Sequence, residues 1–253
     1  MRTRTKVIAF VAFAAAIAAW TFAFLHFRHS ELAVFPQSPF EFYELTDKAQ
    51  GGSSTASLAV SDSAIDVEVN VRSGVAFPAV GIEFNLKSID NRPTGLFDLS
   101  KFDSLEIVFS TRRMHSLSLR VLTEDPVYSR SGRESLRVLT QDVQAGRATS
   151  AVKVPVSAFR TAPWWLSAMG LEEDDGFTYL HKSAYLEIVC GSGVMRGIPD
   201  EISVSGIRLW GTDRDFEKAM FAGAALIVLL LVAFIIYIGK SKEKPLDHRR
   251  KNV

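Results

Sequence analysis

The sequence predicts an all-β fold, an antiparallel β-sandwich of the jelly-roll type, flanked by two transmembrane α-helices. Three observations lead to this fold class. Two stretches of 21 residues, Val7 to Phe27 and Ala219 to Gly239, contain no Asp, Glu, Lys or Arg. Between them, short segments alternate apolar and polar residues, which is typical of strands with one buried face. No long amphipathic helix separates these segments, which favours antiparallel sheets.

The first apolar stretch is long enough to cross a hydrocarbon layer of ~30 Å as a helix. Three basic residues precede it within residues 1–6, so we expect the N-terminus to lie in the cytoplasm. The alternative is a cleaved signal peptide, with small residues at Ala16 and Ala18 or at Thr21 and Ala23 before the cut. Both interpretations export the domain that follows.

The next segment, residues 31–57, lacks a clear strand pattern. Its run from Gly51 to Ser54 is typical of a loop, and its aromatic residues could cover one end of the sandwich. These aromatic residues are Phe35, Phe40, Phe42 and Tyr43.

Strands are predicted where apolar residues recur at every second position. The segments are residues 65–71, 80–86, 105–109, 117–121, 152–156, 186–190 and 202–209. In the last segment the alternation changes phase at Ser205 and Gly206, where we expect a β-bulge. Turn-forming residues occupy positions 91–93, 124–126, 144–146 and 191–193. We therefore expect eight or nine strands.

The second apolar stretch also has the length of a membrane-spanning helix. Ala219 and Gly223 share one of its faces, which would allow another helix to approach closely in lipid. Residues 240–253 follow with six basic and two acidic residues, so we expect this tail in the cytoplasm, against the anionic surface of the lipid bilayer.

The charge of the chain argues against a nucleic-acid partner. The 253 residues carry a formal net charge of +1, but the two basic ends hold +3 and +4, which leaves −6 for the rest. A domain that binds nucleic acid needs a basic face to neutralise phosphates. The exported domain is mildly acidic instead.

Four residues are candidates for ligand binding. Trp164 and Trp165 are adjacent, so in an extended segment they would point to opposite sides, one into the core and one outward. An exposed indole would suit a sugar, because sugar C–H groups pack against an aromatic face. Tyr128 and Arg130 lie on a predicted loop and could add a polar and aromatic rim. The alternative is that all four serve the fold.

Motifs for metals, cofactors and catalysis are weak. The acidic run from Glu172 to Asp175 lacks the ligand spacing of an EF-hand, so a solvated loop is favoured over a calcium site. The five His residues form no zinc motif. Cys190, the only cysteine, lies in an apolar strand pattern and is predicted to be a small buried hydrophobe. We expect no metal, no cofactor and no enzymatic activity.

A hydrolase remains a third reading of the chain. It would build a pair of catalytic carboxylates from the polar faces of the strands. The carboxylates available there are Asp66, Glu68, Glu83 and Glu106.

Several segments in order along the chain carry a family resemblance. They are residues 97–105, 127–129, 154–159, 162–166 and 202–211. The domain resembles the galactose-binding-like jelly rolls related to carbohydrate-binding modules. More narrowly, it resembles the periplasmic sensory domain of bacterial membrane diguanylate cyclases and sensor histidine kinases. Such receptors continue into a cytoplasmic output domain, whereas only 14 residues follow the second apolar stretch here.

Together with the two apolar stretches and the basic ends, the resemblance predicts a protein of the bacterial inner (cytoplasmic) membrane with five parts. These are a cytoplasmic N-terminus (1–6), transmembrane helix 1 (7–27), a periplasmic domain (28–218), transmembrane helix 2 (219–239) and a basic cytoplasmic tail (240–253). The function we expect is that of a non-catalytic accessory or sensory subunit in signal transduction. Its domain would bind a ligand or protein and couple to a separate membrane partner. The alternative is a membrane-anchored carbohydrate-binding module for an envelope glycan.

Overall fold

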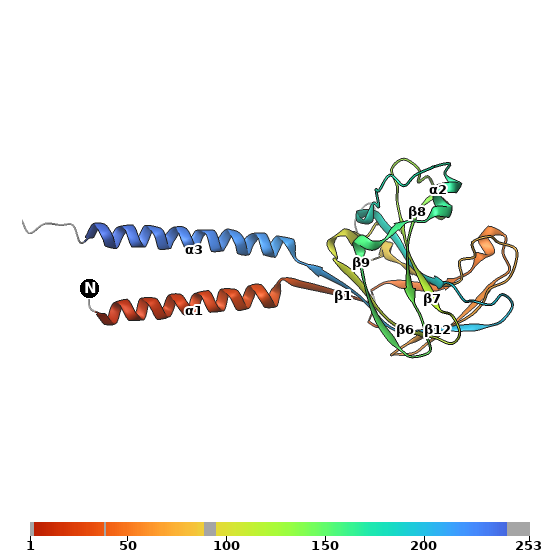
Figure 1. The fold of residues 1–253 in the computed structure, drawn as a ribbon, viewed down its shortest axis with the longest axis horizontal. Helices are drawn as coiled ribbons and strands as arrows, with labels where there is room; N and C mark the ends of the chain where they lie inside the picture. Colours follow the sequence, from red (N-terminus) through yellow and green to blue (C-terminus); the bar gives the residue numbers. More distant parts are fainter. Residues whose placement is uncertain (1–2, 38, 89–94, 242–253) are drawn as a thin grey trace, which may run out of the picture. The chain divides into compact units, whose positions relative to one another are not determined.

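The computed structural model describes residues 3–37, 39–88 and 95–241. The chain divides into two compact units, residues 30–211 and residues 1–29 with 212–253 (Figure 1). The turn predicted at 91–93 lies outside the described residues, and so does the basic tail apart from its first two residues.

The unit of residues 30–211 is a sandwich of two β-sheets. In sheet A the strand order is β3 (Thr55–Val60), β4 (Ile65–Asn70), β12 (Asp200–Thr212), β6 (Ser104–Thr111) and β9 (Ser150–Pro155), and β1 (His29–Phe35) also pairs with β12. In sheet B the order is β10 (Arg160–Thr161), β8 (Arg137–Gln144), β7 (Ser116–Thr123), β11 (Ser183–Cys190), β5 (Gly81–Asn85) and β2 (Glu41–Leu45). Every pairing of known register is antiparallel. The predicted antiparallel sandwich is therefore confirmed.

The core lies between the two sheets and is built from the alternating apolar positions. Ile65, Val67 and Val69 of β4 are fully buried, as the period of two predicts. Facing them from sheet B are the apolar residues of β5, β7 and β11. The register of β12 against β6 shifts between Val204 and Gly206, which confirms the predicted bulge.

Cys190 ends β11 and packs partly buried against this core. Burial, helped by the negative charge of Asp200, raises the pKa of its thiol to about 12. The thiol is therefore protonated at neutral pH, as the prediction of a small hydrophobe requires.

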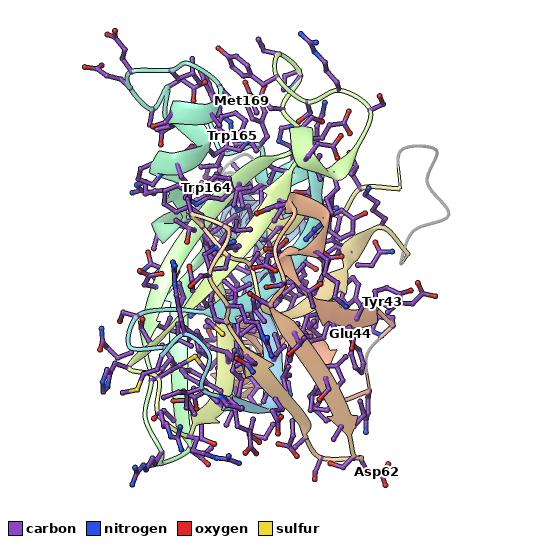
Figure 2. The ribbon with its side chains drawn as sticks, turned by 90° about the vertical axis from the view of Figure 1, so that its right-hand side faces the viewer. Tyr43, Glu44, Asp62, Trp164, Trp165 and Met169 are labelled. Carbon is purple, nitrogen blue, oxygen red and sulfur yellow. The ribbon has the colours of Figure 1, made fainter. Side chains whose placement is uncertain are left out.

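The segment of residues 31–57 corrects the sequence-based prediction. It contains β2, the start of β3 and most of β1, rather than irregular chain. These strands were missed because β2 and β3 stand at sheet ends and carry few buried residues. Figure 2 shows Asp62 at the tip of the β3–β4 hairpin, at one end of the sandwich.

Helical segments are short in this unit. The helix α2 (Pro163–Ala168) carries both Trp164 and Trp165, so the paired tryptophans lie on a helix and not on an extended segment. Figure 2 shows α2 at the end of the sandwich opposite Asp62. Single 3₁₀ turns occupy Asp47–Gln50, Leu86–Ser88, Leu99–Lys101, Arg133–Ser135, Val156–Ala158 and Leu180–Lys182.

The second unit contains two helices, α1 (Thr3–Phe27) and α3 (Arg214–Ser241). Among the described residues, one helical segment is long and apolar enough to cross a membrane, Arg214–Ala233 of α3. The apolar part of α1, Phe13–Phe27, is shorter than such a span. Length and composition thus support the second predicted span, and the first stays a prediction.

The two helices contact each other around a small residue of α3. The indole of Trp20 in α1 occupies the space that a side chain on Gly223 of α3 would fill. Next to it, the rings of Phe24 and Phe221 lie 5.7 Å apart between centroids. Gly223 therefore allows close approach between α1 and α3, the role expected of a small residue on this face.

Candidate ligand-binding site

The outer face of sheet B carries a row of polar side chains that crosses five strands. Register pairs Thr140 of β8 with Arg120 of β7, Arg120 with Glu187 of β11, Glu187 with Glu83 of β5, and Glu83 with Tyr43 of β2. The chain neighbours of Arg120, Glu187 and Glu83 belong to the core, so these three side chains project from the opposite face. We call these five residues the polar row.

Two carboxylates meet directly in the polar row. Glu187 is only 3% exposed and lies opposite Glu83. Like charges that face each other across strands destabilise a sheet. Here Nη2 of Arg133, on the 3₁₀ turn after Gly132, makes an ion pair with both carboxylates. The short turn thus supplies the countercharge that the row requires.

The pKa values of the two carboxyl groups reflect this environment. Burial raises the pKa of Glu187 and of Glu83, and the positive charge of Arg133 offsets part of the rise. Arg120 also opposes the rise at Glu187. The pair is therefore easier to protonate than two exposed glutamates.

Arg120 lies between Thr140 and Glu187 in the polar row and has an aromatic neighbour. Its Cζ lies 5.7 Å from the ring centroid of Trp164, within range of a cation–π interaction. Trp164 in turn stacks on Phe77, with 6.0 Å between centroids and 22° between the planes. Phe77 is 56% exposed. Trp164 and Phe77 form an aromatic platform beside the charged row.

A cavity of about 270 Å³ is lined by Trp164 of the platform and by Arg120 and Glu187 of the row. Its volume is just below the range of ~300–1,000 Å³ that is common for drug-sized ligands, so it suits a ligand about the size of one sugar ring. The residues that line it are Ala49, Gln50, Ala79, Arg120, Leu122, Arg133, Glu134, Leu136, Val138, Trp164, Trp165 and Glu187.

The two adjacent tryptophans have different environments. Trp164 is partly exposed and contributes its ring to the cavity wall. Trp165 is 1% exposed, and its Nε1 donates a hydrogen bond of 2.8 Å to the carbonyl oxygen of Leu136. It belongs to a small apolar cluster under α2. Of the pair, Trp164 is the one that a ligand could stack on.

Tyr128 and Arg130 lie away from the cavity lining. The ring of Tyr128 meets Trp165 edge-on, with 5.9 Å between centroids. Arg130 is exposed on the loop that follows, where its backbone N–H donates to Oγ of Ser135. The structure thus brings Trp164 and Trp165 to the cavity. Tyr128 contacts Trp165 without lining the cavity, and Arg130 does not line it either.

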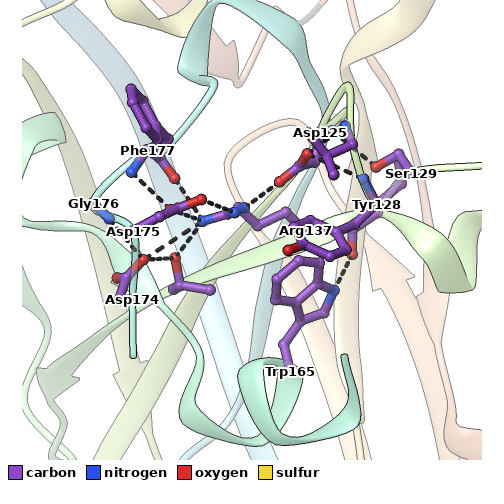
Figure 3. A network of polar contacts seen from close by, with 12 residues as sticks. Asp125, Tyr128, Ser129, Arg137, Trp165, Asp174, Asp175, Gly176 and Phe177 are labelled. Atoms are coloured by element: carbon purple, nitrogen blue, oxygen red, sulfur yellow. Dashed lines mark hydrogen bonds and ion pairs between the residues drawn. The ribbon is translucent and has the colours of Figure 1, made fainter. Parts of the chain in front are cut away.

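A buried arginine fixes the surroundings of Trp165 (Figure 3). Arg137 is fully buried, and its Nε donates to Oδ2 of Asp125 at 2.8 Å. Its Nη1 and Nη2 donate to the two carboxylate oxygens of Asp175 at 2.7 and 2.8 Å. The guanidinium also lies between the rings of Trp165 and Tyr179, 5.0 and 5.5 Å from their centroids. We call this set the Arg137 cluster.

The acidic run at 172–175 therefore has a structural partner. Asp174 and Asp175 both form ion pairs with Arg137, and the hydrogen bond from Arg137 lowers the pKa of Asp175. Residues 172–175 are exposed on a loop, as predicted, and what the sequence did not show is that two of them also pair with a buried arginine. Within the described parts of the chain, no group of three or more His, Cys, Asp or Glu residues could hold a metal ion.

The other carboxylates considered for hydrolysis are not part of the site. Asp66, Glu68 and Glu106 lie on sheet A, where Asp66 accepts a hydrogen bond from Ser203 and Glu106 accepts one from Trp210. Only Glu83 belongs to the polar row. The sequence analysis missed three site residues, Arg120, Arg133 and Glu187. For Arg120 and Glu187, the pattern that could have pointed to them is a charged residue between apolar neighbours in β7 and β11.

Comparisons with known proteins give a fold likeness at low identity. The chain matches no protein-family model and no curated protein. Among solved structures, a family 11 carbohydrate-binding module from Clostridium thermocellum, in complex with a β-1,3-1,4-mixed-linked tetrasaccharide, is 11% identical. The match covers 72% of this chain and 95% of that one, with a TM-score of 0.47.

Two further solved structures show a similar likeness. A family 30 carbohydrate-binding module of a cellulosomal cellulase of Clostridium thermocellum is 14% identical over 73% of this chain and 99% of that one, with a TM-score of 0.44. The agarase AgWH50C is 12% identical over 72% of this chain and 24% of that one, with a TM-score of 0.41. At such values the likeness does not extend to individual site residues.

Proposed function

We propose that this protein is a non-catalytic, membrane-anchored saccharide-binding protein whose site is the cavity on the outer face of sheet B. The observation that carries the proposal is the aromatic platform of Trp164 and Phe77 beside the polar row. A sugar ring offers C–H groups on one face and hydroxyls around its edge. The platform suits the first, and the hydrogen-bonding groups of Arg120 and Arg133 suit the second.

Binding without turnover follows from the position of Arg133. A glycoside hydrolase needs one carboxyl group as an acid and a second as a nucleophile or base. Glu83 and Glu187 are the only two carboxylates of the polar row, and both form ion pairs with the same nitrogen of Arg133. Glu187 is also buried. Glu134 also lines the cavity, but neither Glu83 nor Glu187 is free to act with it as the second carboxylate.

The proposal is tested with the full-length protein in nanodiscs of zwitterionic lipid. A panel of oligosaccharides is screened by calorimetry, and binding is measured again for Trp164→Ala. We expect binding to be lost in this variant while the melting temperature stays close to that of the wild type, because Trp164 is partly exposed. Phe177→Ala removes an exposed aromatic ring outside the cavity and should leave binding unchanged. Equal binding by wild type and Trp164→Ala would refute the assignment.

The accessory-subunit role is the second candidate. It shares the membrane anchor, which α3 supports by its length and composition, and it adds a separate membrane partner. Ligand binding can act on such a partner only if the ligand prefers one of two states of the assembly. Crosslinking in native membranes followed by mass spectrometry tests it, and a partner recovered in constant ratio supports it. Recovery of the protein alone would leave saccharide binding as the function.

A further inference from the structure

Arg120 differs from the other two arginines around the site in its hydrogen bonds. Arg137 donates to Asp125, Asp175, Thr161 and the carbonyl of Phe177. Arg133 makes ion pairs with Glu83 and Glu187. For Arg120, the residues that the structure describes provide the Trp164 ring but no hydrogen-bond acceptor and no ion pair. Its five N–H donors are available to a ligand.

The position of Arg120 makes such a ligand group favourable. The side chain is partly buried, and burial lowers the pKa of its guanidinium. The guanidinium is only partly buried and makes no hydrogen bond among the described residues, so an acceptor that enters the cavity gains charge-assisted hydrogen bonds from it. Glu187 lies next to Arg120 in register but is engaged by Arg133. Asp142 also attracts Arg120 electrostatically, and Glu134 lines the same cavity. Neither makes a hydrogen bond or an ion pair with Arg120 among the described residues, so its donors stay open to a ligand.

The chemistry of a guanidinium identifies the group that fits it. Two parallel N–H donors match the two oxygens of a carboxylate, and the charge makes each hydrogen bond stronger than one to a hydroxyl. A ring that rests on Trp164 would hold a substituent close to Arg120, since the two side chains are in contact. We propose that the saccharide bound in the cavity carries a carboxylate, which pairs with Arg120 while its ring stacks on Trp164. This inference rests on the proposed saccharide binding.

The test uses sugar acids and matched neutral sugars. The first pair is tri-galacturonate and the same trisaccharide after its carboxyl groups are reduced to alcohols. The second pair is a disaccharide that contains N-acetylmuramic acid, with its carboxylate on an ether side chain, and a disaccharide of N-acetylglucosamine. Affinities are measured by calorimetry with full-length protein in zwitterionic nanodiscs. We expect one acid to bind at least ~10-fold more tightly than its neutral partner, with a preference that weakens as salt is added.

Variants at Arg120 then assign the preference to this residue. Arg120→Gln keeps hydrogen-bond donors but removes the charge, so the acid and its neutral partner should bind about equally. Arg120→Lys keeps the charge without the paired donors and should restore only part of the preference. Arg130→Gln removes an exposed arginine outside the cavity and should change nothing. If Arg120→Gln does not fold, the ratio of affinities for the acid and its neutral partner is compared between the wild type and Arg120→Lys, and an unchanged ratio would overturn the inference.

The outcomes separate this inference from the proposed function. Preference for either acid, lost in Arg120→Gln, supports the inference and identifies where the ligand carries its carboxylate. Equal or tighter binding of the neutral sugars would overturn the inference and leave saccharide binding intact. A preference that persists in Arg120→Gln would also overturn it. If no member of the broader oligosaccharide panel binds, the proposed function itself fails.

Discussion

Trp165 is held on three sides by groups of different chemistry. Its Nε1 donates to the carbonyl of Leu136, the guanidinium of Arg137 covers one face of the ring, and Tyr128 meets the ring edge-on. Its neighbour Trp164 is only partly buried: it packs on the edge of the same apolar cluster and contacts Phe77 and Arg120. The two residues should therefore differ in what they contribute to stability.

Trp165→Ala should destabilise the sandwich by about 3–5 kcal/mol, the cost of truncating a large buried aromatic residue. Trp164→Ala should cost less than about 1.5 kcal/mol, because its ring is partly exposed. Urea unfolding of the full-length protein, followed by tryptophan fluorescence and circular dichroism, measures both. A similar loss in the two variants would show that Trp164 serves the fold and would weaken its role as a stacking platform.

The Arg137 cluster allows a second test at the level of single residues. Arg137→Met leaves the fully buried carboxylate of Asp125 without its ion pair, and we expect a loss of about 3–5 kcal/mol. Arg137→Met combined with Asp125→Asn should recover part of it. The control is Arg112→Met, which breaks an exposed pair with Glu201 and should cost about 0–1 kcal/mol. If Arg137→Met and Arg112→Met lose equal amounts of stability, the Arg137 cluster does not stabilise the sandwich more than an exposed ion pair does.

Sheet elements show what could be predicted from the sequence and what could not. The strands that border the core, such as β4 and β6, were visible because every second residue is buried. The bulge in β12 was visible because the phase of alternation changes. The edge strands β2 and β3 could not be predicted, because most of their residues are exposed and their buried residues do not recur at every second position.

The candidate site was predictable only in part for a related reason. The pair of Trp164 and Trp165 stands out in the sequence, although the sequence does not tell which of the two is exposed. Arg120 and Glu187 do not stand out, because a polar residue at an outward strand position is ordinary. They become a site only through register, which joins β7 to β11 across 67 positions of the chain (Arg120 pairs with Glu187). That pairing is decided by packing between distant segments and not by local pattern.

The polar row should give sheet B a distinctive pH dependence. Burial raises the pKa of Glu187 and Glu83 in the folded protein above the ordinary value of 4.5. Ionising a group whose folded pKa is raised destabilises the fold, and this penalty disappears as pH falls through the folded pKa towards the unfolded one. Asp175 has a lowered pKa, so its stabilising effect is lost only at more acidic pH, below 3.8.

We therefore expect the wild type to gain stability relative to Glu187→Gln as pH falls from 7 towards 4.5. Thermal unfolding at a series of pH values measures the difference between the two proteins. Glu201→Gln removes an exposed carboxylate on the other sheet and should track the wild type across this range. If the difference in melting temperature between the wild type and Glu187→Gln stays constant with pH, Glu187 does not titrate between pH 7 and 4.5.

At the scale of the whole molecule, the chain combines a sandwich with its own core and a separate helical unit. Within the helical unit, α3 carries a run of exposed apolar side chains that includes Leu226, Leu229 and Leu230. In water these would be unfavourable, whereas in a bilayer they face lipid. The proposed anchoring of the protein depends on this helix.

Changing both Leu226 and Leu229 to Asp should lower the fraction of the protein that membranes retain. Each Asp near the centre of a spanning helix costs ~2.5–3.5 kcal/mol for insertion. Carbonate extraction of membranes from cells that express each variant measures the retained fraction. Phe177→Asp, which adds a charge at an exposed position of the sandwich, should remain in the membrane fraction. Full retention of the double variant would mean that α3 is not required for anchoring and that α1 is enough.

The solitary thiol at the end of β11 has a practical consequence for such experiments. Maleimides and disulfide reagents react with thiolates, and a pKa of about 12 leaves almost none of Cys190 in that form at neutral pH. A cysteine introduced at an exposed position would therefore be labelled far faster than the native one. Fluorophores or spin labels could be placed on α1, on α3 or beside Phe77 in the otherwise unaltered protein, so that ligand-induced movement is followed without a cysteine-free background.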